Sequence, residues 1–216
     1  MTSRWIGLLL IVATTVFGVA VMNQLPERVP IHWGISGQVD GYASRTFAVW
    51  FIPIVSVGVW LLFAFVPQLD PINKNYASMR STIQRFNNAI ALFMCLVQGA
   101  VLMNALGWPI SMPRAILIGI GMLFVILGNE MGRLRRNSWF GIRLPWTLAD
   151  EDVWRQSHRV GGRIMLVAGL LMVVASLITP LLVMMWLFMG IVLCMSLGLI
   201  GYSYWVAVQK NRLTSR

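Results

Sequence analysis

The feature that most constrains this chain is a series of apolar runs, each long enough to cross a membrane as a helix. A helix rises 1.5 Å per residue, so about 20 apolar residues span the hydrocarbon core of a bilayer. Four such runs are followed by one continuous apolar tract: Trp5–Met22, Phe47–Val66, Ala89–Leu106, Pro113–Leu127 and Ile164–Val208. The last tract is too long for one span, and Thr179-Pro180 divides it, because proline breaks or kinks a helix. The sequence therefore predicts six spans, the last two near Ile164–Ile178 and Leu181–Ala207, joined by a tight turn.

The composition excludes an ordinary soluble domain. Hydrophobic residues make up 58% of the 216 residues and charged residues only 11%, whereas about a quarter of a soluble domain is charged. The net charge of +10 would indicate nucleic acid as a partner of a soluble protein. Here the charges lie between apolar runs and indicate topology instead. We therefore expect the lipid bilayer as a partner and no direct nucleic-acid binding.

The distribution of basic residues predicts the orientation. With the N-terminus inside, fourteen of the 17 lysines and arginines fall on the cytoplasmic side and three outside, as the positive-inside rule requires. The cytoplasmic set is Arg4, Lys74, Arg80, Arg85, Arg133, Arg135, Arg136, Arg143, Arg155, Arg159, Arg163, Lys210, Arg212 and Arg216, and the external set is Arg28, Arg45 and Arg114.

These patterns together predict an all-α integral membrane protein of the bacterial cytoplasmic membrane, with both termini cytoplasmic. Residues 1–66 form a two-helix region with an external loop at 23–46. Residues 67–127 carry the third and fourth spans. Residues 128–216 hold a cytoplasmic loop at 128–163 and the last helix hairpin.

The external loop is expected to be ordered but not helical, because Gly34, Gly37 and the Asp40-Gly41 pair are typical of turns. The functional interpretation is a surface that binds a partner outside the membrane. The alternative is an interfacial cap with an Asp40–Arg45 ion pair. A metal site with His32 is disfavoured because no third ligand has suitable spacing. The candidate binding residues are His32, Trp33, Asp40, Tyr42 and Arg45.

The cytoplasmic loop predicts a short helix from Thr147 to about Val160. Thr147 is expected to cap it, with Asp150 three residues later, and Gly161-Gly162 to end it. Glu151 and Arg155 are spaced for a surface ion pair. Such a helix can lie along the headgroups, with its arginines near anionic lipid, which is the structural alternative to a functional role.

Two features of this loop favour function. Asn129 and Glu130 directly follow the fourth span, and polar residues at that depth need partners. Arg143, between Gly141 and Pro145, can bind a phosphate or carboxylate. The candidate coupling surface is Asn129, Glu130, Asn137, Arg143, Pro145, Trp146, Thr147, Trp154, His158 and Arg159.

No catalytic motif is present, and the predicted topology puts the two histidines on opposite sides of the membrane. We therefore expect no enzyme, no catalytic residues, no cofactor and no metal. A small lipid or peptide transporter is the alternative, disfavoured because no charged residue lies near a midplane. A membrane enzyme using Glu130, Arg143 and His158 is weaker still.

The two loops resemble the SdpI family of integral membrane immunity proteins. The external loop is similar to the family's N-terminal domain of unknown function, through Leu25-Pro26-Glu27-Arg28-Val29-Pro30-Ile31-His32-Trp33, Gly37, Asp40-Gly41-Tyr42 and Arg45. The cytoplasmic loop carries the resemblance through Gly128-Asn129, Asn137, Gly141-Ile142-Arg143, Pro145-Trp146-Thr147-Leu148, Trp154 and His158-Arg159. The resemblance implies protection against a secreted peptide toxin and capture of a cytoplasmic transcriptional repressor at the membrane. It places the toxin at the external loop and the repressor at the cytoplasmic loop.

Overall fold

The computed structural model describes residues 5–70 and 76–214, in which six helices are long and apolar enough to cross a membrane. They are α1 (Trp5–Val21), α2 (Arg45–Phe65), α3 (Tyr76–Ala105), α4 (Met112–Met131), α6 (Glu151–Ile178) and α7 (Leu181–Thr214). The shorter elements are β1 (Arg28–Trp33), β2 (Val39–Ser44), α5 (Pro145–Ala149) and 3-10 turns at Met22–Gln24 and Val66–Leu69. The predicted count of six is confirmed, the short fourth span included. Of the predicted cytoplasmic basic residues, Arg4, Lys74 and Arg216 lie outside the described residues.

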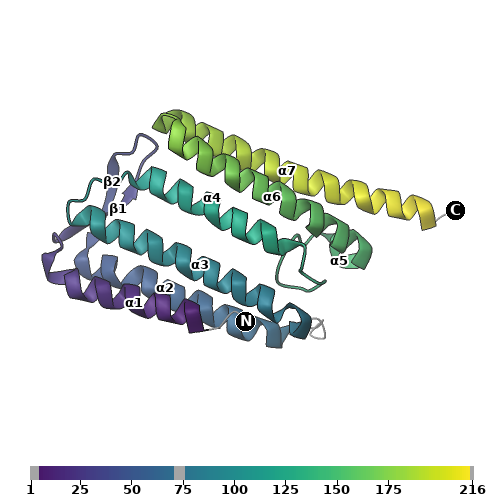
Figure 1. Ribbon diagram of the computed structural model, residues 1–216, viewed down its shortest axis with the longest axis horizontal. Helices are drawn as coiled ribbons and strands as arrows, with labels where there is room; N and C mark the ends of the chain where they lie inside the picture. Colours follow the sequence, from purple (N-terminus) through teal and green to yellow (C-terminus); the bar gives the residue numbers. More distant parts are fainter. Residues whose placement is uncertain (1–4, 71–75, 215–216) are drawn as a thin grey trace.

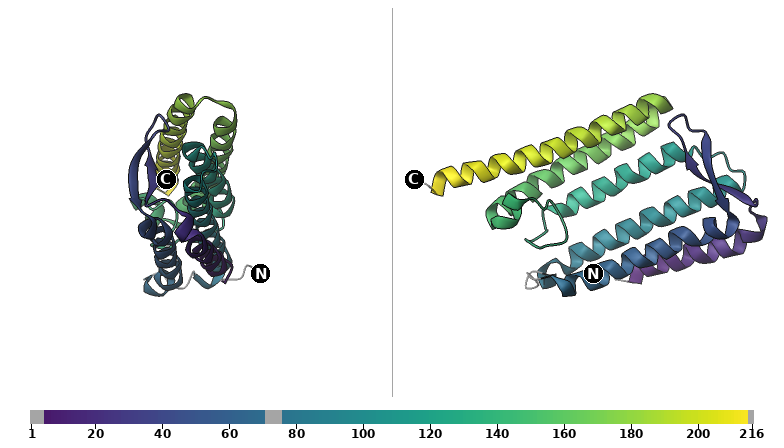
Figure 2. Two further views of the ribbon diagram at one scale, coloured as in Figure 1. Left: turned by 90° about the vertical axis from the view of Figure 1, so that its left-hand side faces the viewer. Right: turned by 180° about the vertical axis from the view of Figure 1, so that it is seen from behind.

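The long helices run alternately up and down along one axis (Figure 1). Helices α1, α2 and α3 pack against one another, α4 packs between α3 and α6, and α7 packs mainly on α6. The start of α1 and the end of α7 both lie away from β1 and β2 along this axis, as the right-hand view of Figure 2 shows. This gives the molecule two ends: the hairpin end, which carries β1, β2 and the α6–α7 turn, and the loop end, which carries residues 132–150.

The arrangement separates the basic residues as the sequence predicts. Arg28, Arg45 and Arg114 belong to elements at the hairpin end, and the other described lysines and arginines lie in the loop-end half of the bundle. Which end faces the cytoplasm stays a prediction.

Within the predicted 23–46 loop, residues 28–44 form an antiparallel β-hairpin, an element that the sequence did not predict. Its turn includes Gly37, whose φ of 80° is a left-handed conformation that favours glycine. The Asp40-Gly41 pair, expected in a turn, lies in β2 instead. Buried Val29 anchors the hairpin to a core shared with α2, α3 and α4. At the tip, a Cβ on Gly37 would come within 2.6 Å of the Leu181 side chain, so the hairpin reaches the start of α7.

Glycines bring α4 and α6 into close contact. A Cβ on Gly162 would lie 2.5 Å from the carbonyl oxygen of Gly128, and one on Gly169 equally close to that of Gly121. Small residues let membrane helices approach backbone to backbone. The prediction that Gly161-Gly162 ends a short helix is therefore wrong: α6 continues through both glycines, which serve packing rather than termination.

Candidate functional site

The five external candidates gather on or beside the hairpin, at the hairpin end. His32 Nδ1 contacts a carboxylate oxygen of Asp40, and both side chains are more than half exposed, at 71% and 52%. The predicted Asp40–Arg45 pair is wrong, because Arg45 lies 3.9 Å from Glu27 instead. In β1 and β2 the register places His32 opposite Gly41, so Asp40 faces the imidazole from the paired strand.

The rest of the hairpin surface mixes aromatic and apolar groups. The guanidinium of Arg28 lies 5.4 Å from the centre of the Tyr42 ring, a cation–π arrangement. Ile35 and Tyr42 are 56% and 50% exposed, whereas Trp33 packs partly against the core beneath the hairpin. Within residues 5–70 and 76–214 no three His, Cys, Asp or Glu side chains gather as metal ligands would. The hairpin therefore exposes charged, aromatic and aliphatic groups side by side.

At the loop end, His158 is fully buried rather than lying on a surface helix. Its ring stacks on the ring of Trp154, which lies four residues earlier on the same face of α6, with the ring centres 3.9 Å apart. Its Nδ1 donates to the Trp154 carbonyl at 2.8 Å, and its Nε2 accepts from the Ile142 amide at 2.9 Å. Because one nitrogen donates and the other accepts, these bonds require the neutral imidazole.

The His158 ring explains the glycine of the G-I-R motif. Gly141 has a φ of 105°, and a Cβ there would lie 2.1 Å from His158 Nε2. Only glycine fits this position, and it lets the chain pass over the ring so that the next amide reaches it. His158 therefore organises the loop.

Two further candidates, Asn137 and Thr147, are also fully buried and structural. Asn137 accepts from the amides of Trp139 and Phe140, and donates to two carbonyl groups in the same loop. The Thr147 hydroxyl donates to the Ile142 carbonyl at 2.6 Å and accepts from the Leu144 amide at 2.9 Å. The expected Thr147 cap of the following helix is wrong, because Thr147 lies inside α5.

Asp150 is the residue that caps α6, accepting from the amides of Asp152 and Val153. Lys210 of α7 binds Asp150 at 2.7 Å and Asp152 at 2.9 Å. Burial raises the pKa of Asp150, but the Lys210 hydrogen bond and the two amides outweigh it and hold that pKa below its ordinary value. Asp152, not the predicted Glu151, pairs with Arg155.

Trp146 ties α5 to α7 beside this ion pair. Its indole Nε1 donates to Ser203 at 3.0 Å, and its ring lies edge-on to Tyr204. Lys210 and Trp146 together fix the end of α7 to the loop.

Asp70 is an important site residue that the sequence interpretation missed. It is 4% exposed and accepts from the Tyr76 hydroxyl, the Ser138 amide and the Ser138 hydroxyl, at 2.8 to 2.9 Å. It therefore joins the end of α2 to the loop across 68 residues of sequence. The available signal was an acid directly after an apolar span, in a chain with only 7 acidic residues.

Glu130 has the partners that its depth requires. Its buried carboxylate lies 2.8 Å from Arg85 Nε and 2.7 Å from Arg133, and the Thr82 hydroxyl also points to it. Asn129, next in the chain, is exposed and lines the same pocket as Arg85 and Glu130. Glu130 thus joins α3 to α4, and Asn129 lies at the exposed edge of this cluster.

Three of the loop-end candidates, Arg143, Pro145 and Arg159, are exposed. Pro145 is the first residue of α5, a position suited to proline. Arg143 and Arg159 are exposed, and in the part of the chain that the structure describes neither forms a hydrogen bond or ion pair. Arg143 also lies within electrostatic range of Tyr76. The buried candidates therefore build a rigid loop, and Arg143 is the charged group of the G-I-R motif that this loop presents.

Comparison with known proteins supports both loops. Residues 133–203 match the SdpI/YfhL protein family, and residues 9–57 match a domain of unknown function, DUF1648. Over 213 residues the chain is 24% identical to Immunity protein SdpI of Bacillus subtilis (strain 168), covering 98% of this chain and 100% of that protein. No solved structure matches. The resemblance drawn from the two loops is confirmed, and with the six apolar helices it supports a multi-pass protein of the cytoplasmic membrane.

Proposed function

Starting from the premise that this chain is related to SdpI over its whole length, we propose that it is a non-catalytic membrane immunity protein. It protects its cell against a secreted, membrane-active peptide. The observation that carries the proposal is the end-to-end match to a protein named as an immunity protein. That match includes the hairpin and the G-I-R loop, the two ordered ends of the bundle.

The hairpin is the proposed peptide-binding surface. Asp40 and Glu27 offer exposed carboxylates, and Ile35 and Tyr42 offer exposed apolar surface beside them. A peptide that attacks membranes commonly combines basic and apolar side chains. Such a peptide fits this surface and would be held at the hairpin before it inserts.

The loop end is the proposed signalling surface, where a cytoplasmic transcriptional repressor would be captured. Arg143, exposed on a rigid loop, would pair with an acidic group of that partner. Helix α7 links the two ends, because Leu181 lies against the hairpin tip and Lys210 binds Asp150 at the loop end. Peptide binding at the hairpin would shift α7 and so alter the surface around Arg143.

The experiment is a survival assay in toxin-sensitive cells that express the protein, challenged with a panel of secreted membrane-active peptides. Wild type is expected to raise survival, and Asp40→Asn to lower it. Cells that express Arg143→Gln are expected to survive as well as those with the wild type. They should no longer switch on a reporter gene that the repressor controls. Ser36→Ala, in the exposed hairpin turn, is the matched control, and membrane insertion is measured for each variant. Normal insertion without protection from any peptide would contradict the immunity proposal.

A further inference from the structure

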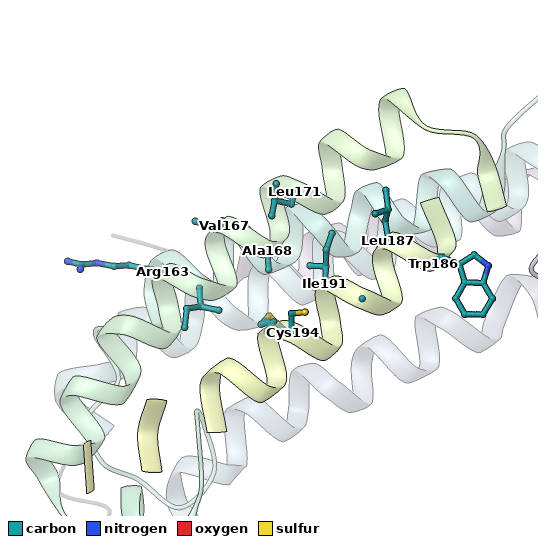
Figure 3. A pocket seen from close by; sticks show the side chains of 11 residues that line it. Arg163, Val167, Ala168, Leu171, Trp186, Leu187, Ile191 and Cys194 are labelled. Carbon is teal, nitrogen blue, oxygen red and sulfur yellow. The ribbon is translucent and has the colours of Figure 1, made fainter. Parts of the chain in front are cut away.

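The α6–α7 contact leaves an apolar groove on the surface of the bundle, with a volume of about 600 Å³. Its walls are Val167, Ala168 and Leu171 of α6 and Leu187, Gly190 and Ile191 of α7. Figure 3 shows Trp186 at one end and Arg163 at the other, with the guanidinium extending beyond the groove. We propose that this groove binds one acyl chain of an anionic phospholipid, whose phosphate pairs with Arg163.

The first argument is the unmatched charge at the end of the groove. Arg163 and Arg159 are exposed, and neither has a hydrogen bond or ion pair among residues 5–70 and 76–214. They stand four residues apart on α6, a spacing at which like charges repel. An anion between or beside them removes that repulsion, and a phosphate accepts hydrogen bonds from guanidinium groups especially well.

The second argument is depth. Arg163 stands 15 residues before the end of α6 at Ile178, which is about 22 Å along the helix. The hydrocarbon core is about 30 Å thick, so the Cα atom of Arg163 lies inside it. The side chain must extend toward the loop end to reach the membrane interface. A guanidinium exposed to lipid at that depth needs an anion that the bilayer itself supplies.

The third argument is length. From Arg163 to Leu171 the groove follows eight residue steps of α6, which is about 12 Å. This is close to one leaflet of the hydrocarbon core, about 15 Å. A lipid of the leaflet at the loop end therefore reaches Arg163 with its phosphate and lies along the groove with a chain.

A second copy of this chain is the competing occupant, and the charges disfavour it. No acidic residue occurs in α7 or in α6 beyond Asp152, and buried Glu130 is already paired with Arg85. The apolar faces of another copy therefore bring no carboxylate to Arg163. The lipid supplies both the chain and the anion.

The test uses the full-length protein in nanodiscs of phosphatidylglycerol or phosphatidylcholine, with retained lipid counted by native mass spectrometry after transfer to detergent. Wild type should retain one phosphatidylglycerol more firmly than phosphatidylcholine. Gly190→Leu fills the groove and should abolish retention. Gly201→Leu is the matched control, because the Cβ at either glycine meets nothing within 4 Å. Arg163→Gln should weaken the retention of phosphatidylglycerol about five-fold and remove the preference for it over phosphatidylcholine.

Equal retention by wild type, Gly190→Leu and Arg163→Gln would overturn the proposal. So would a dimer that Gly190→Leu dissociates without changing retained lipid, since the groove would then hold a second copy. The unfolding temperature of each variant separates lost binding from lost folding. The result is independent of immunity, because lipid retention is measured without any peptide.

Discussion

The side-chain amide of Gln98 on α3 donates to the backbone carbonyl of Val49 on α2, at 3.3 Å. In an unbroken helix that carbonyl would accept from the amide of residue 53, but residue 53 is proline and has no N–H. Gln98 also donates to the Ala48 carbonyl at 3.0 Å. A fully buried side-chain amide on one helix thus supplies a donor to the carbonyl group that a proline leaves without one on the neighbouring helix, as a lipid-embedded backbone requires.

Gln98→Leu should therefore destabilise the protein by about 1 kcal/mol, because the Val49 carbonyl loses its donor. In a Pro53→Ala background the same substitution should cost less, because an alanine at position 53 supplies the backbone N–H that the proline lacks. The measurement is a double-mutant cycle on unfolding in detergent micelles. Equal costs of Gln98→Leu in both backgrounds would contradict the coupling.

Close packing of α4 on α6 predicts a strong dependence on glycine. Gly162→Ala should destabilise the protein by about 1–3 kcal/mol, because its Cβ would meet the Gly128 carbonyl at 2.5 Å. Gly201→Ala adds the same methyl group in open space on α7 and should be neutral or slightly stabilising. The unfolding temperatures of the two variants compare them directly, and similar values would show that the helices can separate at little cost.

The six spans could be predicted because length and hydropathy are local properties of each segment. The break in the last apolar tract was placed correctly at Thr179-Pro180, since proline acts on its own turn. Gly161-Gly162 was interpreted wrongly, because a glycine that ends a helix and one that admits a neighbouring helix look alike in sequence. Only the position of Gly128 on α4 decides between the two.

The contacts of the candidate site also divide into local ones, which the sequence can indicate, and long-range ones, which it cannot. The stacking of Trp154 on His158 is compatible with their four-residue spacing, which places both side chains on one face of a helix. Ser138, which binds Asp70, and Arg85, which binds Glu130, lie 68 and 45 residues away from them in sequence, and nothing local specifies these two pairs. Asp40 was paired with Arg45 of the same loop, whereas strand pairing brings Asp40 to His32.

Gly141→Ala should release the G-I-R loop. Its positive φ is strained for alanine, and its Cβ would clash with His158 Nε2. Gly107→Ala is the control, because Gly107 has a φ of 92° but no neighbour within 4 Å of its Cβ. We expect faster tryptic cleavage at Arg143 in Gly141→Ala only. Unchanged cleavage would mean that the loop does not depend on the His158 contact.

Glu130→Gln should destabilise the junction of α3 and α4, because it leaves Arg85 and Arg133 without their shared carboxylate. The loss in free energy of unfolding should stay below about 3 kcal/mol, since both arginines are partly exposed and can be hydrated again. Glu151→Gln removes an exposed carboxylate of the same type and should change little. Chemical unfolding in micelles measures both, and equal effects would show that Glu130 is not a specific partner.

The Asp150–Lys210 pair predicts a pH dependence of stability. Despite its burial, hydrogen bonds from Lys210 and from the α6 amides hold the pKa of Asp150 below its ordinary value of 3.8. Its ionised form is therefore favoured in the folded state, so the added stability is present above about pH 4 and is lost as the pH falls through the folded pKa.

Asp150→Asn keeps a side-chain oxygen that can cap α6 and removes only the charge. The difference in unfolding temperature between wild type and Asp150→Asn should be greatest near pH 7 and should shrink as the pH falls to 3. Lys210→Met should produce at least as large a difference at pH 7, because it also removes one of the two cations that pair with Asp152. A difference of constant size across that range would show that capping, and not the ion pair, holds α7 against the loop.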